Sequence, residues 1–249
     1  MQNHKNMQTR THKKYFFLLS FSLLTLCLAA QPKSLVKPIA ANPSNINMQV
    51  YRQSLSLGDY NTAINAIHYL LASDPVKYAS FQDTLALVYL QNNNLRQGYL
   101  IADALLKNRG YSDMRLEIKA ICAKGLQQPV EAINAYATLF SNTKTPAFGF
   151  EELQLQYSIR RLAETITTGN TLLQSLPVKD SSRINILKAD GKTVQQVSLK
   201  AAVNNIMGLA YIDLKNKSNA ILNLDAALKE NPDFEQAKNN KITALALAN

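Results

Sequence analysis

A pattern that repeats about every 34 residues constrains the fold of this 249-residue chain more than any other feature of its sequence. Between residues 44 and 140, apolar residues recur at helical spacing in blocks that are separated by short polar turns. A small residue follows each turn, at Ala63, Gly98 and Ala132, so the steps are 35 and 34 residues. Such a period with two helices per unit predicts stacked helical hairpins, each of which needs its neighbour to bury an apolar face.

A further copy of the pattern lies near the C-terminus. Gly208 and Tyr211 occupy its first helix, and Ala220 and Leu224 occupy its second. The small residues Gly208 and Ala220 are expected to let the two helices approach closely. Pro232 is expected to end the second helix, because a proline ring cannot continue one.

These residues resemble the tetratricopeptide repeat (TPR) pattern, over residues 44–140 as three units and over residues 201–234 as one. Three positions depart from the pattern. Tyr51 stands where a small residue belongs, Ala123 replaces the tyrosine, and Leu224 replaces the aromatic residue of the second helix. The resemblance implies an all-α fold, an α-solenoid of stacked helical hairpins with a non-repeat insertion before the last repeat.

The insertion falls within residues 141–200, because Gly208 follows its counterpart Ala120 by 88 residues, about 20 more than two periods. The apolar spacing over residues 150–176 predicts one long helix. Residues 177–191 favour a loop or a short hairpin, because Ile184-Asn185-Ile186 alternates as a strand does, and a helix could begin at about Thr193. A degenerate repeat unit is the alternative. Gly169 is expected to lie outside the repeats, so Gly169→Leu should matter less than Gly208→Leu.

The first 30 residues have the pattern of a secretory signal peptide. A basic stretch precedes an apolar run of sixteen residues that ends in small ones, which is too short to span a membrane comfortably. Lipidation at Cys27 is the competing reading, and Leu26 argues against it because that motif has a small residue there. We therefore expect export to the periplasm or the extracellular space, with no membrane span after signal removal.

Both ends of the mature chain have simpler patterns. Residues 31–43 contain three prolines and no periodicity, and they are expected to form a flexible linker. Residues 235–249 mix polar and apolar residues as the capping helix of a repeat array does.

Few residues remain for catalysis once residues 1–30 are removed. One histidine, His68, and one cysteine, Cys122, are too few for a structural zinc site or an internal disulfide. No two glycines lie closer than Gly98 and Gly110, which excludes glycine-rich dinucleotide loops and nucleophile elbows. We expect no catalytic residue, no cofactor and no metal.

The predicted function is a non-enzymatic scaffold or adaptor that binds a peptide or a partner protein. Stacked hairpins line a groove with their first helices, and a mixed apolar and charged groove suits an extended peptide or a partner helix. The candidate groove residues are Met48, Arg52, Asp83, Leu87, Glu117, Ile121, Asn205 and Leu209. Relatives that hold acidic C-terminal peptides use Lys, Arg and Asn at such positions, and Met48 and Asp83 do not fit that set.

Two alternatives of other classes remain. The first is an accessory envelope enzyme with its site in residues 141–200, a stretch with five acids and neither histidine nor cysteine. The second is a weak binder of a polyanion or polysaccharide, based on seven Lys or Arg against three Asp in residues 177–217. The formal net charge of +10 overstates this second case, because four of the bases lie in residues 1–30. No specific nucleic-acid partner is expected.

Overall fold

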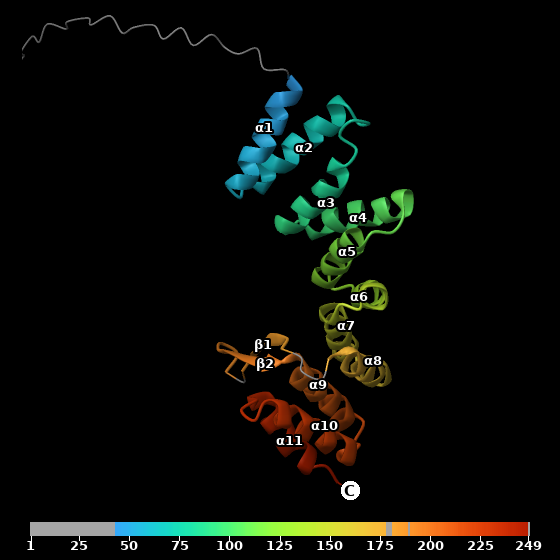
Figure 1. Ribbon diagram of the computed structural model, residues 1–249, viewed down its shortest axis with the longest axis vertical. Helices are drawn as coiled ribbons and strands as arrows, with labels where there is room; N and C mark the ends of the chain where they lie inside the picture. Colours follow the sequence, from blue (N-terminus) through green and yellow to red (C-terminus); the bar gives the residue numbers. More distant parts are fainter. Residues whose placement is uncertain (1–42, 178–180, 189, 249) are drawn as a thin grey trace, which may run out of the picture. The chain divides into compact units, whose positions relative to one another are not determined.

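The computed structural model describes residues 43–177, 181–188 and 190–248, which form eleven helices and one β-hairpin (Figure 1). The helices are α1 (Pro43–Ser56), α2 (Tyr60–Ser73), α3 (Phe81–Gln91), α4 (Leu95–Arg109), α5 (Asp113–Gly125), α6 (Pro129–Thr143), α7 (Pro146–Ser158), α8 (Leu162–Ser175), α9 (Leu199–Asp213), α10 (Lys217–Glu230) and α11 (Glu235–Leu245). The strands are β1 (Arg183–Leu187) and β2 (Val194–Ser198). The expected signal peptide, Cys27 and the expected linker up to residue 42 lie outside the described residues.

Each helix packs against the next helix along the chain. The helices α3 and α5, α7 and α9, and α9 and α11 are also in contact, so alternate helices meet as in a stack of hairpins. The predicted all-α solenoid of helical hairpins is therefore confirmed for the described residues. Small residues supply the close contacts: Gly98 lies over Cys122, and Gly208 lies over Leu224.

The same turn joins the two helices of every pair. One residue in each turn has a positive φ, and these residues are Gly58, Asn93, Gln127, Arg160 and Lys215. The N–H of this positive-φ residue donates to the carbonyl three positions before it. The N–H of the following residue donates to the carbonyl five positions before that following residue, and all of these bonds are 2.8–3.1 Å long. These two bonds form the Schellman motif, which ends a helix by satisfying its last carbonyls.

The spacing of these turns locates the insertion. The steps are 35, 34 and 33 residues as far as Arg160 and 55 residues from there to Lys215. The pair α7/α8 is therefore a fourth unit in phase with the first three. The additional residues form the segment between α8 and α9, which contains the β-hairpin.

The prediction of one long helix over residues 150–176 is wrong. Helix α7 ends at Ser158 and α8 begins at Leu162, because Arg160 adopts the left-handed conformation with φ of 63°. The degenerate repeat unit is the alternative that matches. Thr165 takes the place of the small second-helix residue, and its Oγ1 donates to the carbonyl of Arg161 at 2.8 Å, which satisfies the buried hydroxyl.

The residue sizes in the α7/α8 unit are also exchanged relative to the last unit. In the last unit, the small Gly208 on the first helix faces Leu224 on the second. In α7/α8, the large Leu153 lies on the first helix, and a Cβ added at Gly169 on the second would lie 3.5 Å from it. That Cβ would also lie 2.5 Å from Met207 Sδ. The placement of Gly169 outside the repeats is therefore wrong, and a larger side chain there is expected to be costly.

The segment before α9 is a hairpin rather than the start of a helix. Ile184 pairs with Val197 in antiparallel register, and both pack against the core. Helix α9 begins only at Leu199, where Ser198 Oγ accepts a hydrogen bond from the N–H of Ala201 at 3.1 Å. The alternation at Ile184-Asn185-Ile186 indicated β1, and a helix from Thr193 is wrong because β2 occupies those residues.

The turn residues give a first testable prediction. Gln127 is exposed and has φ of 57°, a conformation that costs a residue with a Cβ about 1–2 kcal/mol and costs glycine nothing. After the larger loss of chain entropy for glycine, Gln127→Gly is expected to stabilise the protein by about 0.5–1 kcal/mol. Thermal unfolding followed by circular dichroism measures the change. Gly58→Gln is the reciprocal control and should destabilise, and a lower melting temperature for Gln127→Gly would contradict the turn assignment.

Candidate partner-binding groove

Two neighbouring hollows lie between α7 and β1. The first has a volume of about 390 Å³ and is lined by Gln154, Tyr157, Asn185, Ile186, Leu187, Ala202, Asn205, Ile206, Leu209, Phe234 and Gln236. The second has a volume of about 490 Å³ and is lined by Thr145, Pro146, Ala147, Phe150, Glu151, Gln154, Ser182, Arg183, Ile184, Asn185 and Leu199. Because Gln154 and Asn185 line both, the hollows adjoin along β1, and together they are called the α7–β1 groove here.

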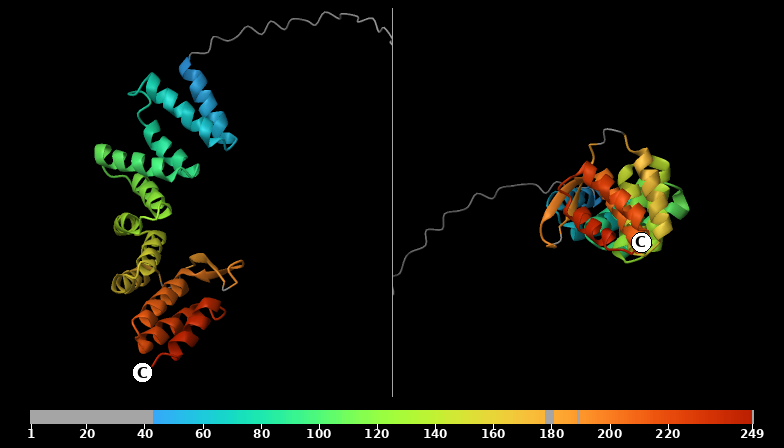
Figure 2. Two further views of the ribbon diagram at one scale, coloured as in Figure 1. Left: turned by 180° about the vertical axis from the view of Figure 1, so that it is seen from behind. Right: turned by 90° about the horizontal axis from the view of Figure 1, so that it is seen from below.

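Hydrogen bonds to the start of α11 fix the β-hairpin as a wall of this groove. The Gln195 side chain donates to the carbonyl of Asp233 at 2.6 Å and accepts from the N–H of Glu235 at 3.1 Å. Gln236 Nε2 donates to the carbonyl of Leu187 at 2.7 Å. Figures 1 and 2 show the hairpin beside α9, which contacts both strands, and near α11.

One edge of β1 pairs with β2, and the backbone groups of its other edge point away from β2. The backbone bonds from Lys188 to Thr193 and from Leu199 to Ser182 set the alternation of the ladder. In this register the N–H and C=O groups of Arg183 and Asn185 point away from β2. Within the described residues, no hydrogen bond satisfies these groups of Asn185, which makes β1 an open edge strand beside the groove.

The structure brings two of the eight predicted groove residues together. Asn205 and Leu209 on α9 line the α7–β1 groove, and Asn205 Oδ1 also accepts from Asn240 Nδ2 at 2.8 Å. The other six lie on α1, α3 and α5 and do not reach this groove. Met48, Leu87, Glu117 and Ile121 are half-buried, and Arg52 is exposed.

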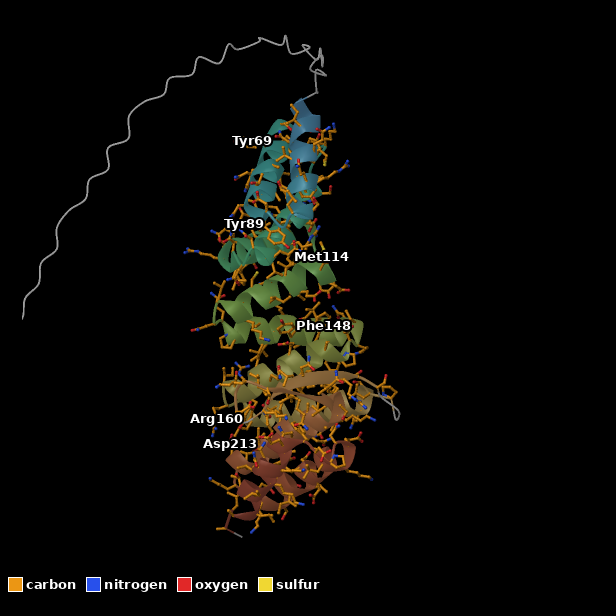
Figure 3. All side chains as sticks on the ribbon, turned by 90° about the vertical axis from the view of Figure 1, so that its left-hand side faces the viewer. Tyr69, Tyr89, Met114, Phe148, Arg160 and Asp213 are labelled. Carbon is orange, nitrogen blue, oxygen red and sulfur yellow. The ribbon has the colours of Figure 1, made fainter. Side chains whose placement is uncertain are left out.

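Asp83, the remaining predicted groove residue, joins two repeat units. Its Oδ2 accepts from Arg115 Nη2 at 2.9 Å, and this hydrogen bond lowers the pKa of the Asp83 carboxyl below its usual range. A similar pair connects Arg160 in the α7/α8 turn to Asp213 at the end of α9, at 2.9 Å (Figure 3). These charges stabilise the contact between neighbouring units, so Asp83 is less available to a partner than the sequence suggested.

Sequence reasoning missed the groove residues on α7, β1 and α11. Gln154 was assigned to a single long helix, and Asn185 and Gln236 were assigned to an irregular insertion and a cap. The only signal for this wall was the strand-like alternation around Asn185, which does not say where the strand packs.

The residues with reactive side chains are placed for packing. Cys122 is fully buried, and burial raises the pKa of its thiol to about 11, which keeps it protonated and unreactive. His68 Nε2 lies 2.9 Å from the hydroxyl of Tyr89. Glu151 pairs with Lys124. In the described part of the chain, no three His, Cys, Asp or Glu side chains are grouped as metal ligands would be.

The basic residues that the structure describes in the segment 177–217 lie in separate places. Arg183, Lys188 and Lys192 belong to the hairpin before α9, whereas Lys215 and Lys217 follow α9. The 15 residues of this helix span about 22 Å. Two groups at opposite ends of a helix do not form the continuous basic surface that a polyanion prefers.

Comparisons with known proteins address the fold. No model of a known protein family matches the sequence, and no curated protein matches it. The solved structures that resemble it include YrrB, described as a TPR protein with an unusual peptide-binding site, at 15% identity, with 79% of this chain and 90% of that chain covered and a TM-score of 0.58. A structure of MamA matches at 16% identity, with 76% and 92% covered and a TM-score of 0.56.

A second MamA structure, labelled AMB-1, matches at 11% identity with the same coverage and TM-score. Among the described residues, the helices lack the length and apolar character needed to cross a bilayer. Identities this low bear on the fold alone, and they agree with the hairpin stack described above. The chain therefore has the fold of a tetratricopeptide-repeat solenoid, with a β-hairpin inserted before its last repeat.

Proposed function

We propose that this chain is an exported, non-enzymatic scaffold that binds an extended segment of another protein in the α7–β1 groove. The observation that carries this proposal is the open edge of β1 beside the groove. An extended peptide can add a strand to such an edge, because its own N–H and C=O groups match those of Asn185. The structural likeness to a TPR protein with a peptide-binding site supports the choice of ligand class.

The chemistry of the groove suits the backbone and side chains of such a segment. The side-chain amides of Gln154 and Asn185 line both hollows, have no partner within the described residues, and can donate and accept hydrogen bonds. Ile186, Ile206 and Leu209 offer apolar surface to alternate side chains of the segment. The hollows are within the size range of binding sites, which is about 300–1,000 Å³.

Export and the absence of catalysis rest on different evidence. The basic and apolar pattern of residues 1–30 supports export. The burial of Cys122 and the pairing of Glu151 support a non-enzymatic role.

The proposal is tested with a peptide selected on the purified protein from a random display library. Asn185→Pro removes the outward N–H together with the side-chain amide, and an edge strand tolerates proline at such a position, so we expect the peptide to bind about tenfold more weakly. Leu209→Glu places a charge in the apolar part of the groove and should weaken binding at least as much. Isothermal titration calorimetry measures both affinities.

Two controls make the test specific. Asn185→Ala keeps the backbone N–H and should bind within about threefold of the parent. Leu222→Glu changes an exposed residue of α10 outside the groove and should bind normally. A selected peptide that binds all four variants equally well would show that the α7–β1 groove is not the binding site. Equal binding by Asn185→Pro alone would rule out strand addition.

A further inference from the structure

A separate groove lies between α6 and α8, with α7 beneath it. Two hollows of about 420 Å³ each form it, and both are lined by Ala137, Glu152, Thr167 and Thr168. None of its lining residues belongs to the α7–β1 groove. This α6–α8 groove is therefore separate from the α7–β1 groove.

A buried carboxylate lies in this groove. Glu152 is 8% exposed, and its Oε1 accepts hydrogen bonds from Gln156 Nε2 at 2.8 Å and from Thr168 Oγ1 at 3.2 Å. Both bonds fall on the same oxygen, so Oε2 has no partner within the described residues. Burial raises the pKa of the Glu152 carboxyl, and the two hydrogen bonds partly offset that effect.

A second acceptor in the groove is also unsatisfied. Gln156 is 4% exposed, and its Oε1 is buried with no hydrogen-bond partner. Leaving a buried carbonyl oxygen unpaired costs about 1–3 kcal/mol. Gln156 and Glu152 line the same hollow, so this unpaired oxygen lies beside the Glu152 carboxylate, buried in the wall of the groove.

The lining around Glu152 supplies further acceptor oxygens. The hydroxyls of Thr167 and Thr171 donate to the carbonyls four residues earlier, each at 3.0 Å, so their oxygens remain acceptors toward the groove. Two cations lie at its edges and neither pairs with Glu152. Arg161 pairs with Glu164 at 3.1 Å, and Lys144 is exposed. A small cation with several N–H donors matches this lining.

We propose that the α6–α8 groove binds an alkylammonium group, with the Glu152 carboxylate as its counter-ion. An ammonium group has one positive charge and three donors, which match the Glu152 carboxylate and the acceptor oxygens of Thr167 and Thr171. Charge-assisted bonds of this kind are about twice as strong as neutral ones. The group can belong to a lysine side chain of a partner protein or to a free amine. This inference does not depend on the binding function of the α7–β1 groove.

Calorimetric titration of the purified protein with n-butylamine tests the proposal, and n-butanol serves as the neutral ligand of similar shape. We expect saturable binding of the amine and none of the alcohol. Glu152→Gln keeps the shape and removes the charge, and it should weaken amine binding at least about tenfold. Circular dichroism of the variant verifies its fold. Glu131→Gln, an exposed acid of α6 outside the groove, is the matched control and should bind as the parent does.

Two further ligands identify the source of the ammonium group. Tighter binding of N-acetyl-lysine methylamide than of 1,5-diaminopentane indicates a partner's lysine, and the reverse order indicates a free amine. Three results overturn the proposal: no saturable amine binding, equal binding of the alcohol, or unchanged amine affinity in a folded Glu152→Gln variant.

Discussion

Phe234→Ala is expected to lower the free energy of unfolding by about 3–5 kcal/mol, the usual cost of removing a buried aromatic ring. Phe234 is 1% exposed and belongs to the core cluster that joins α9, α10 and α11, against which Ile184 and Ile186 of β1 pack. Removal of the ring leaves a cavity where these elements meet. For a protein of this size, the melting temperature should fall by about 10 °C.

The matched control for Phe234→Ala is Ile242→Ala on α11. Ile242 is 67% exposed, so its truncation should change stability by no more than about 0.5 kcal/mol. Chemical denaturation monitored by circular dichroism compares the two variants with the parent. Equal unfolding midpoints for Phe234→Ala and the parent would contradict the packing of α11 and the hairpin on α9.

Gly208→Leu is expected to destabilise the protein by about 3 kcal/mol, at the upper end of the usual cost of overpacking. A Cβ at this position would lie 2.6 Å from Leu224 Cγ and 2.8 Å from its Cδ2, which is closer than two carbon atoms can pack. The helices α9 and α10 must then separate or Leu224 must leave its rotamer. Thermal unfolding measures the loss.

A compensating substitution makes this second prediction specific. Leu224→Ala alone creates a cavity and should destabilise, but in the double variant the new leucine can occupy the space vacated by Leu224. The double variant should therefore be more stable than the sum of the single effects predicts. Strict additivity of the two effects would show that the side chains do not meet. Ala220, on α10, is also a fully buried small residue, so Ala220→Leu should behave like Gly208→Leu.

The hairpin stack could be predicted from sequence because its determinants are local and periodic. The small residues Ala63, Gly98 and Ala132 each mark a close contact between helices, and each belongs to a turn-and-helix pattern that spans a few residues. The sequence pattern does not identify a repeat unit in which the large and the small residue of one helix–helix contact have changed places. In α7/α8, Leu153 and Gly169 exchange the sizes found in the last unit and Thr165 replaces alanine, so these positions no longer match the pattern.

The sequence by itself determined the helical periodicity, the stacked hairpins and the place of an insertion, because these follow from residues close together in the chain. The tertiary structure alone decided what the insertion does. The bonds from Gln195 to Asp233 and Glu235 join residues 38 and 40 positions apart, and they place the open edge of β1 beside α7. The meeting of Glu152 with Thr168 likewise depends on how α7 and α8 pack. Such contacts form only when separate helices and strands are brought together, so they cannot be predicted from the spacing of residues along the chain.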